Sequence, residues 1–291
     1  MQKNGRGFSF KLNSKKVVYE FIVNRKIMRI TGDSATGKTA LIDKIEESAY
    51  LNSGVHVECK YPYEVMDDRF FKMIKEDILA ICEKIEKHSS KAFVDAMRNL
   101  LHRHDNILFF ADESFSSIAS EEFALFCKYT DAFFVLVTRD PLYMLPYSYT
   151  ELYEIKTSGK FHQFVPCYNQ ESFLTIDLDR KVIVEDKLAG FEFFKQFCEN
   201  SYSADGKSNI RSLLKVDNLQ IVADGAAFGC EIENIILDIE RCGLNIKLFL
   251  PESFEYLLLD SELFKGIVKE EELDPKSVSG LYFLVNSTIQ N

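Results

Sequence analysis

Apolar residues along the first half of the chain fall into short runs whose spacing predicts the secondary structure. Strand-forming runs rich in valine, isoleucine and phenylalanine occupy residues 7–12, 16–23, 26–30, 54–59, 106–113 and 132–140. Apolar residues at helical spacing predict helices over residues 38–50, 66–104 and 120–130. The first two strands are expected to form a hairpin. Because strands and helices then alternate, we expect a parallel sheet with helices on both faces.

The second half of the chain repeats a strand–helix pair three times. The strands are expected at residues 181–186, 219–225 and 245–251, and the helices at residues 190–200, 231–242 and 253–264. The polar stretch at residues 201–209 interrupts this pattern. A second, smaller α/β unit therefore follows the first. We expect two domains, residues 1–165 and residues 166–291.

Charge separates the two predicted domains. Residues 1–165 contain 23 Lys and Arg and 23 Asp and Glu, whereas residues 166–291 contain 12 against 22 and carry the whole net charge of −10. An acidic domain does not bind nucleic acid by charge alone, because lysine or arginine must neutralise the phosphates. Residues 1–38 hold nine Lys and Arg against two acids. A nucleic-acid partner therefore stays open, beside the simpler interpretation of a solvated basic edge.

Cysteine usage and hydropathy indicate a location. The seven cysteines form no Cys-x-x-Cys pair and the five histidines form no metal-binding pattern, so free thiols in a reducing cytoplasm are expected. No apolar run approaches the ~18 residues that a membrane span needs. The first ten residues also lack the apolar core of a secretory signal. We therefore expect a cytoplasmic protein without a membrane partner.

The motif GDSATGKT lies between the strand at residues 26–30 and the helix at residues 38–50. It fits G-x-x-x-x-G-K-[ST], a loop whose glycines let backbone N–H groups turn inward around phosphate. The start of the following helix adds partial positive charge. Lys38 is expected to reach the β- and γ-phosphates, and Thr39 to coordinate Mg²⁺. The expected nucleotide-binding residues of this motif are Gly32, Asp33, Ser34, Ala35, Thr36, Gly37, Lys38 and Thr39.

Two acids end the apolar strand at residues 106–113. An apolar strand delivers such acids to the carboxyl edge of a parallel sheet, where Asp112 is expected to hold the Mg²⁺ shell. Glu113 is expected to polarise the attacking water as a general base. The alternative is that both acids cap the following helix, because the sequence DESFSS is also typical of a cap.

The strand at residues 132–140 ends in the sequence VTRD. Thr138 is a candidate for contact with the γ-phosphate or with the lytic water. Arg139 is a candidate for stabilising charge in the transition state. An ion pair between Arg139 and Asp140 at the start of a loop is the alternative.

These residues resemble the ASCE branch of P-loop NTPases, the additional-strand, catalytic-glutamate class that includes the AAA+, RecA and ABC groups. The resemblance covers residues 8–145 and rests on Gly32–Thr39, on Asp112–Glu113 and on the strand that ends at Thr138. It implies a parallel sheet in which one inserted strand separates the Asp112 strand from the strand before Lys38. The implied catalytic residues are Lys38, Glu113 and Arg139.

The resemblance to the ABC group is partial. The N-terminal hairpin is similar to the β-rich start of ABC-type ATPases, but no LSGGQ-like stretch occurs between residues 50 and 112. A coiled-coil insertion is also missing, so we do not expect the head-to-head dimer of that group. The sequence contains no base-reading motif such as NKxD. This favours ATP over GTP as the nucleotide.

Acids also end the strands of the second predicted domain. The first strand closes with Glu185 and Asp186, and the next closes with Asp224. Acids at the carboxyl ends of neighbouring parallel strands converge on the crevice where such sheets bind ligands, and grouped carboxylates attract Mg²⁺. The alternative is structural: Asp224 forms a turn with the next glycine, and Glu185 caps a helix.

The order of these acids resembles a TOPRIM domain, the metal-binding module of topoisomerases, primases and overcoming-lysogenisation-defect nucleases. The resemblance covers residues 180–265, with Glu185 ending the first strand, Asp224 at the first position of an Asp-x-Asp pair, and Glu255 at an acidic helix position. It implies a second metal site formed by these three acids. Ala226 occupies the second position of the Asp-x-Asp pair, so one metal ligand is missing from this degenerate set. Either Glu231, Glu255 or Asp186 substitutes for it, or the domain is a non-catalytic relative that binds a partner.

Three functions remain open. The first is an ATPase whose nucleotide state controls how the acidic domain docks on a partner protein or on a second copy of the chain. The second is an ATP-regulated, Mg²⁺-dependent nuclease, like the ATPase–TOPRIM proteins that act in defence against phage. The third is a scaffold subunit that binds nucleotide without turnover. The complete phosphate-binding motif and the incomplete TOPRIM set favour the first, with ATP and Mg²⁺ as cofactors.

Overall fold

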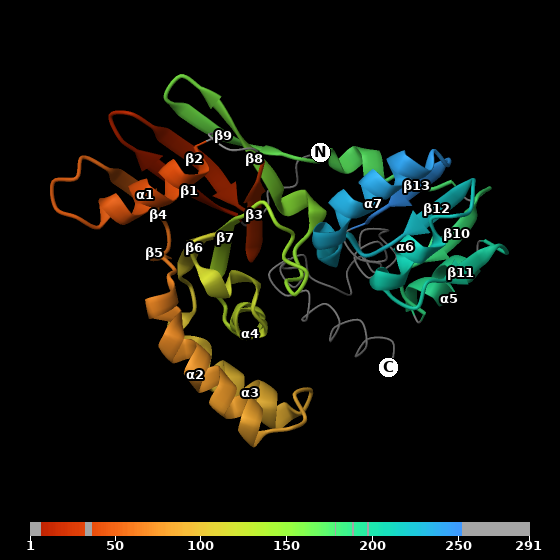
Figure 1. Cartoon of the computed structure of the whole chain (residues 1–291), viewed down its shortest axis with the longest axis horizontal. Coiled ribbons are helices and arrows are strands. Elements are labelled where there is room, and N and C mark those ends of the chain that lie inside the picture. The colour runs from red at the N-terminus through yellow and green to blue at the C-terminus, as the bar shows by residue number, and fades with distance from the viewer. Residues whose placement is uncertain (1–6, 33–36, 178, 188, 197, 252–291) are drawn as a thin grey trace, which may run out of the picture. The chain divides into compact units, whose positions relative to one another are not determined.

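The computed structural model describes residues 7–32, 37–177, 179–187, 189–196 and 198–251. The chain divides into two compact units (Figure 1). Unit 1 comprises the chain up to Leu145 together with Glu151–Cys167, and unit 2 comprises Pro146–Thr150 and the chain from Tyr168 onward. The short segment Pro146–Thr150 belongs to unit 2 because it is bonded there: the N–H of Gly229 donates to the carbonyl of Tyr147 at 3.0 Å.

Unit 1 contains a nine-stranded sheet in the order β4-β1-β2-β9-β8-β3-β7-β6-β5. The strands are β1 (Phe8–Asn13), β2 (Val18–Val23), β3 (Ile27–Thr31), β4 (His56–Cys59), β5 (Tyr63–Val65), β6 (Leu108–Asp112), β7 (Phe133–Val137), β8 (Leu152–Ser158) and β9 (Phe161–Pro166). The strand β7 lies between β3 and β6. One strand therefore separates the strand before Lys38 from the strand that carries Asp112.

The sheet is mixed, and the prediction of a parallel sheet was wrong for part of it. The strands β8, β3, β7, β6 and β5 run parallel. The predicted hairpin of β1 and β2 is antiparallel, and β4 adds to it antiparallel at the edge. The strands β8 and β9 form a second antiparallel hairpin, which the sequence analysis did not predict. Apolar and polar residues do not follow the burial pattern there, since β8 ends in exposed polar residues, and β9 begins with an exposed Phe161 and a buried His162.

The structure describes four α-helices in unit 1, three of which begin at side-chain caps, at Asp67, Ser90 and Ser120. They are α1 (Lys38–Ser48), α2 (Asp68–Lys84), α3 (Lys91–Leu101) and α4 (Glu121–Tyr129), with the short 3-10 helices η1 (His102–His104) and η2 (Ser116–Ala119). The single helix expected over residues 66–104 is two helices. Ile85 adopts an extended conformation that ends α2, and the Ser90 side chain accepts from the N–H of Phe93 to start α3.

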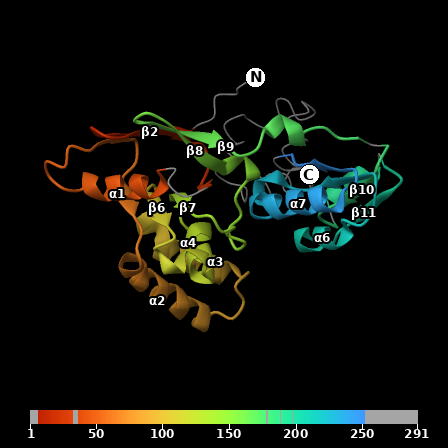
Figure 2. The ribbon, with the colours of Figure 1, turned by 45° about the horizontal axis from the view of Figure 1, so that its top comes forward.

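Opposite faces of the parallel strands meet different layers. Phe110 of β6 packs against Phe10 of β1 with ring centroids 5.0 Å apart, in one buried cluster with Leu41 of α1. The neighbouring Phe109 packs against Phe126 of α4 at 5.6 Å. The helices α2, α3 and α4 lie together below the sheet in Figure 2. Helices therefore cover both faces, and each buried phenylalanine contributes roughly 1.5–3 kcal/mol by removal from water.

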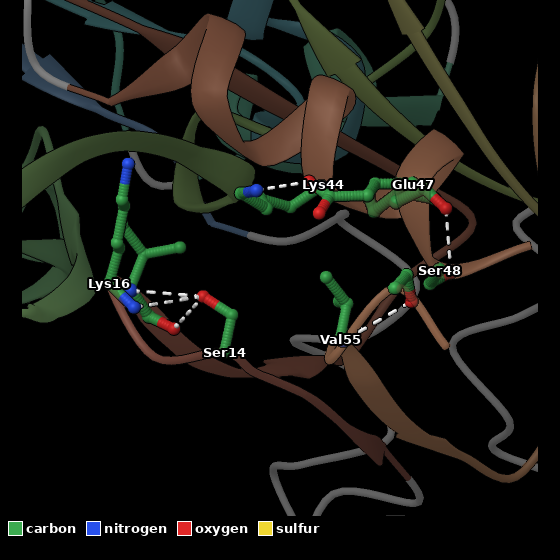
Figure 3. A network of polar contacts seen from close by, with 9 residues as sticks. Ser14, Lys16, Lys44, Glu47, Ser48 and Val55 are labelled. Atoms are coloured by element: carbon green, nitrogen blue, oxygen red, sulfur yellow. Dashed lines mark hydrogen bonds and ion pairs between the residues drawn. The ribbon is translucent and has the colours of Figure 1, made fainter. Parts of the chain in front are cut away.

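The turn between β1 and β2 is closed by one serine side chain. Ser14 Oγ accepts from the N–H of Lys16 at 3.3 Å and from the N–H of Val17 at 3.1 Å, as Figure 3 shows. In the same view Lys44 and Glu47 form an ion pair on α1. The serine bonds fix the register of the hairpin, whereas an ion pair of this kind stabilises the helix only slightly.

Unit 2 contains a four-stranded parallel sheet in the order β11-β10-β12-β13. Its strands are β10 (Lys181–Val184), β11 (Ser201–Ser203), β12 (Leu219–Val222) and β13 (Ile246–Phe249). Its helices are α5 (Ala189–Lys195), α6 (Ile210–Leu213) and α7 (Gly229–Cys242), with the 3-10 helices η3 (Tyr149–Glu151, which crosses the unit boundary), η4 (Gln170–Phe173), η5 (Lys207–Asn209) and η6 (Gly225–Ala227). The strand β11 was not predicted, because its sequence SYS is polar. The helix expected at residues 253–264 lies outside the described residues.

Within the described part of the chain, no helix combines the length and the apolar character that crossing a membrane requires.

Candidate functional site

The loop between β3 and α1 carries the glycine motif. Gly32 follows β3 with φ +104°, and Gly37 precedes α1 with φ +96°, a region that favours glycine. A larger residue at position 37 would also clash with its surroundings, because a Cβ there would lie 2.9 Å from the ring of His162. Four of the predicted phosphate-binding residues, Asp33, Ser34, Ala35 and Thr36, lie outside the described residues.

The Lys38 side chain folds back over this loop. It is buried, and its Nζ donates a hydrogen bond to the carbonyl of Gly32 at the other end of the motif. The ammonium group therefore lies against the backbone that the motif is expected to wrap around phosphate. Thr39, the next residue, is exposed at the start of α1. A helix N-terminus with a buried lysine and an accessible hydroxyl is suited to an anion and its metal ion.

The register of the parallel strands brings the predicted site residues to one edge. Ile30 of β3 pairs with Val137 of β7, and Val137 pairs with Asp112 of β6. Neighbouring strands lie about 4.8 Å apart, so Asp112 lies about 10 Å from Ile30 along the sheet. Parallel strands end on the same edge, so the chain leaves β3 at Gly32, β7 at Thr138 and β6 beyond Asp112 on the same side.

The two acids after β6 have different partners. Asp112 Oδ1 accepts from the N–H of Ser114 at 2.9 Å and from its hydroxyl at 2.5 Å. Glu113 is exposed, and its Oε1 accepts from the N–H of Arg139 at 2.8 Å. One oxygen of Asp112 thus stabilises its own turn, in part as the capping alternative expects. The Glu113 carboxylate is held between the ends of β6 and β7.

The residues after β7 bond to both neighbouring strand ends, at Ile30 and at Glu113. Thr138 is buried, its N–H donates to the carbonyl of Ile30 at 3.0 Å, and its hydroxyl accepts from the N–H of Asp140 at 3.2 Å. The Arg139 side chain is exposed. Thr138 therefore joins the end of β7 to β3 beside the glycine loop, and the backbone of Arg139 meets Glu113.

Sequence reasoning missed Arg29, which lies in the middle of β3 and is only 1% exposed. The Arg29 Nη2 donates to the carbonyl of Arg139 and also lies 3.4 Å from the Thr31 hydroxyl, to which it donates. Among the described residues its Nε has no hydrogen-bond partner. A charged residue inside an apolar strand is a signal that could have identified it. Its guanidinium anchors the loop that presents the Arg139 N–H to Glu113.

Sequence reasoning also missed two aromatic residues beneath the glycine loop. The Tyr19 hydroxyl of β2 donates to the Gly37 carbonyl at 2.7 Å. The Tyr19 ring stacks on His162 of β9, with ring centroids 4.6 Å apart and planes inclined by 18°. No sequence pattern connects these residues to the motif. Tyr19 lies 18 residues before Gly37, and His162 lies on the β8–β9 hairpin, which was not predicted.

The acids of unit 2 lie at the carboxyl edge of its sheet and accept backbone N–H groups. Glu185 Oε2 accepts from the N–H of Asp224 at 3.1 Å, and Asp224 Oδ1 accepts from the N–H of Ala226 at 3.1 Å. Asp186 accepts from the N–H groups of Gly190 and Phe191, at 3.1 and 2.9 Å, at the start of α5. The turn expected at Asp224 is thus present, whereas the helix cap expected of Glu185 is made by Asp186.

Burial raises the pKa of the Glu185 carboxyl above its ordinary value. The Asp224 N–H and the charge of Lys207 act in the opposite direction, and the charge of Asp186 adds to the rise. Lys207 also donates to Cys230 Sγ at 3.5 Å. Glu185 is therefore surrounded by one lysine, one N–H donor and a second acid.

A metal site of several protein ligands is not formed within the described residues, where no group of three or more His, Cys, Asp or Glu side chains could hold a metal ion. The predicted ligand Glu255 lies outside them. A magnesium ion in a nucleotide site commonly uses one or two protein ligands besides phosphate. Thr39 and Asp112 lie on the edge that carries the glycine motif and remain suited to such an ion, and Asp112, like Glu185 and Asp224, uses one oxygen for a backbone N–H.

The sequence matches no known family model, and no curated protein is significantly similar to it.

Proposed function

We propose that unit 1 is an ATP-binding P-loop ATPase of the ASCE class, and that its nucleotide state controls the docking of the acidic unit 2 on a partner. The observation that carries this proposal is the common edge of three parallel strands. The glycine motif with Lys38 leaves β3, Thr138 ends β7, and Asp112 and Glu113 end β6. The Arg139 N–H holds Glu113 at this edge.

The residues present fit a magnesium–nucleotide complex. Gly32 and Gly37 adopt positive φ at the two ends of the motif, and a Cβ at Gly37 would lie 2.9 Å from His162. Lys38 supplies a buried positive charge for phosphate. Thr39 and Asp112 would hold Mg²⁺, which neutralises phosphate charge when bound. The lack of a base-reading motif in the sequence favours ATP.

Two groups are assigned to hydrolysis. Glu113 is exposed and ends the strand that lies beyond β7 from the phosphate loop, where it would orient and polarise a water molecule. The exposed Arg139 guanidinium would stabilise charge that develops on the phosphate. The Arg29 guanidinium acts through the backbone, because it holds the carbonyl of Arg139, the residue whose N–H meets Glu113.

Unit 2 is proposed as the element that responds to the nucleotide. Residues 166–291 carry the whole net charge of −10, which suits a partner with a basic surface. The backbone bonds of Asp186 and Asp224 stabilise the fold of unit 2. These contacts support a docking role for unit 2 over metal-dependent nuclease activity.

Two substitutions test the ATPase. We expect Lys38→Ala to weaken nucleotide binding about 10- to 100-fold, because a charged donor to phosphate is lost. We expect Glu113→Gln to bind nucleotide normally and to lower phosphate release about 100-fold or more. Matched controls are Lys44→Ala on the same helix and Glu121→Gln on α4, both expected to behave as the unaltered protein. Unchanged nucleotide affinity of Lys38→Ala would contradict the proposal.

Control of docking by the nucleotide is tested by measuring the mass of the assembly that the full chain forms, with and without ATP, and by identifying the molecules that co-purify with it. A partner or a second copy that associates in only one nucleotide state supports control of docking. The same composition in both states, in a protein that hydrolyses ATP, removes the switch and leaves the ATPase. Metal-dependent nicking of plasmid that is lost in Glu185→Ala would favour a nuclease instead.

A further inference from the structure

Tyr19 places a buried hydroxyl under the last glycine of the phosphate-binding motif. The side chain is fully buried on β2, and the hydroxyl donates to the Gly37 carbonyl at 2.7 Å. Burial, with the Asp43 charge as a smaller cause, raises the pKa of Tyr19 to about 12. The hydroxyl therefore keeps its proton near neutral pH and stays a hydrogen-bond donor.

His162 holds the Tyr19 ring from the other side. The two residues are register partners on the parallel pair β2 and β9, and their rings are stacked. His162 Nδ1 and the Thr157 hydroxyl of β8 lie 2.9 Å apart and share a hydrogen bond. Burial lowers the pKa of His162, so the ring is neutral near physiological pH. The hydrogen bond with Thr157 across the β8–β9 hairpin thus fixes the orientation of the His162 ring.

Both side chains press against Gly37. A Cβ at that position would lie 2.9 Å from His162 Nδ1 and 3.1 Å from the Tyr19 hydroxyl. The φ of +96° and the first helical bond, from the Leu41 N–H to the Gly37 carbonyl at 3.0 Å, define the same peptide. The end of the glycine loop is therefore restrained by the tyrosine, the histidine and the helix together.

The orientation of this peptide decides where one phosphate donor points. In a trans peptide the C=O and the following N–H lie in one plane and point in opposite directions. The Gly37 carbonyl is held toward Tyr19 and into α1. The N–H of Lys38 therefore points the other way, out of the helix N-terminus, where an anion would be bound.

We propose that Tyr19 and His162 are positioning residues of the nucleotide site, which hold the Gly37–Lys38 peptide in the orientation that binds phosphate. The proposal rests on the proposed nucleotide-binding function of unit 1. It gives the β1–β2 and β8–β9 hairpins a role at the site. A preformed donor requires no reorganisation when phosphate enters, so its effect is on affinity.

The test compares Tyr19→Phe with Tyr153→Phe in the full chain, using direct binding of ATP with Mg²⁺ and steady-state hydrolysis. Each substitution removes one tyrosine hydroxyl. That of Tyr19 bonds Gly37, whereas that of Tyr153 lies 3.5 Å from Glu151, away from the motif. We expect Tyr19→Phe to bind ATP about fivefold more weakly, the effect of one hydrogen bond. The KM should rise by a similar factor while kcat at saturation stays unchanged, and Tyr153→Phe should change neither.

A histidine pair separates positioning from general destabilisation. His162→Ala removes the ring that supports Tyr19 and should weaken ATP binding to a similar extent. His162→Phe keeps a stacked ring and should restore most of the affinity. Equal ATP affinity of Tyr19→Phe and Tyr153→Phe overturns this inference but leaves the ATPase intact. Absence of ATP binding by the unaltered protein overturns the proposed function and this inference with it.

Discussion

Both units end apolar parallel strands on acidic residues, yet the two edges use their acids differently. In unit 1 Asp112 accepts the N–H of Ser114 in its own turn, and the exposed Glu113 accepts a single backbone N–H from the neighbouring strand end. In unit 2 Asp186 accepts two N–H groups of α5, and Glu185 and Asp224 each accept one more. The edge of unit 1 also carries the glycine motif and the buried Lys38. At the edge of unit 2 the acids bond to the turn and the helix start that follow the strands.

A strand-end acid thus becomes a candidate for chemistry only through the groups that lie beside it. A carboxylate that accepts backbone N–H groups stabilises a helix start or a turn. A carboxylate that faces solvent beside a cationic loop can hold a metal ion or a water molecule. Sequence alone gave both edges the same pattern, an apolar run followed by acids.

The largest effect is expected at the edge of unit 1. Asp112→Ala should lower Mg²⁺-dependent ATP hydrolysis about 100-fold, because a proposed metal ligand is lost. Thermal unfolding should change little, since the bonds of Asp112 to Ser114 lie on an exposed turn. Phosphate release and the unfolding temperature of the full chain are the measurements. Full hydrolysis in this variant would remove the distinction between the two edges.

The acid Asp186 of unit 2 should show the opposite behaviour. Asp186→Ala should destabilise the start of α5 by about 1 kcal/mol, the usual cost of losing a helix cap, and leave ATP hydrolysis unchanged. Amide hydrogen exchange at Gly190 and Phe191 should become faster, while exchange at the start of α4 serves as an internal control. Loss of hydrolysis with unchanged exchange would mean that Asp186 is functional and not structural.

The smallest effect is expected at Glu185. Burial raises its pKa, so the folded state holds this proton more tightly than the unfolded chain does. Its contribution therefore favours folding at low pH and is lost as the pH rises from the ordinary carboxyl pKa through the raised one. Glu185→Gln keeps an acceptor for the Asp224 N–H without the charge. It should raise stability at alkaline pH and have little effect under acidic conditions.

Unfolding temperatures across pH measure this difference, with Asp238→Gln on the partly exposed face of α7 as a comparison. A pH profile of Glu185→Gln that is parallel to that of the unaltered protein would show that Glu185 titrates alike in the folded and unfolded states.

Much of the fold could be predicted because buried strands correspond to apolar runs in the sequence. The strands β3, β6, β7, β10, β12 and β13 were expected from such runs, and the β1–β2 hairpin from two short β-rich segments. The β8–β9 hairpin was missed because apolar and polar residues do not alternate clearly along its exposed parts. The strand β11 was missed because it is polar. The break at Ile85 within one apolar pattern was also missed, since Ser90 can start a new helix without interrupting the periodicity.

Local sequence patterns predicted the glycines of the candidate site, the lysine and threonine at the helix start, and the acids that end apolar strands. The hydrogen-bond partners of these residues follow from the tertiary fold. The pairing of β3, β7 and β6 places Glu113 at the N–H of Arg139, and the pairing of β2 with β9 places Tyr19 and His162 under Gly37. The physical reason is that local conformation depends on neighbouring residues, whereas hydrogen-bond partners distant in sequence depend on strand order and register.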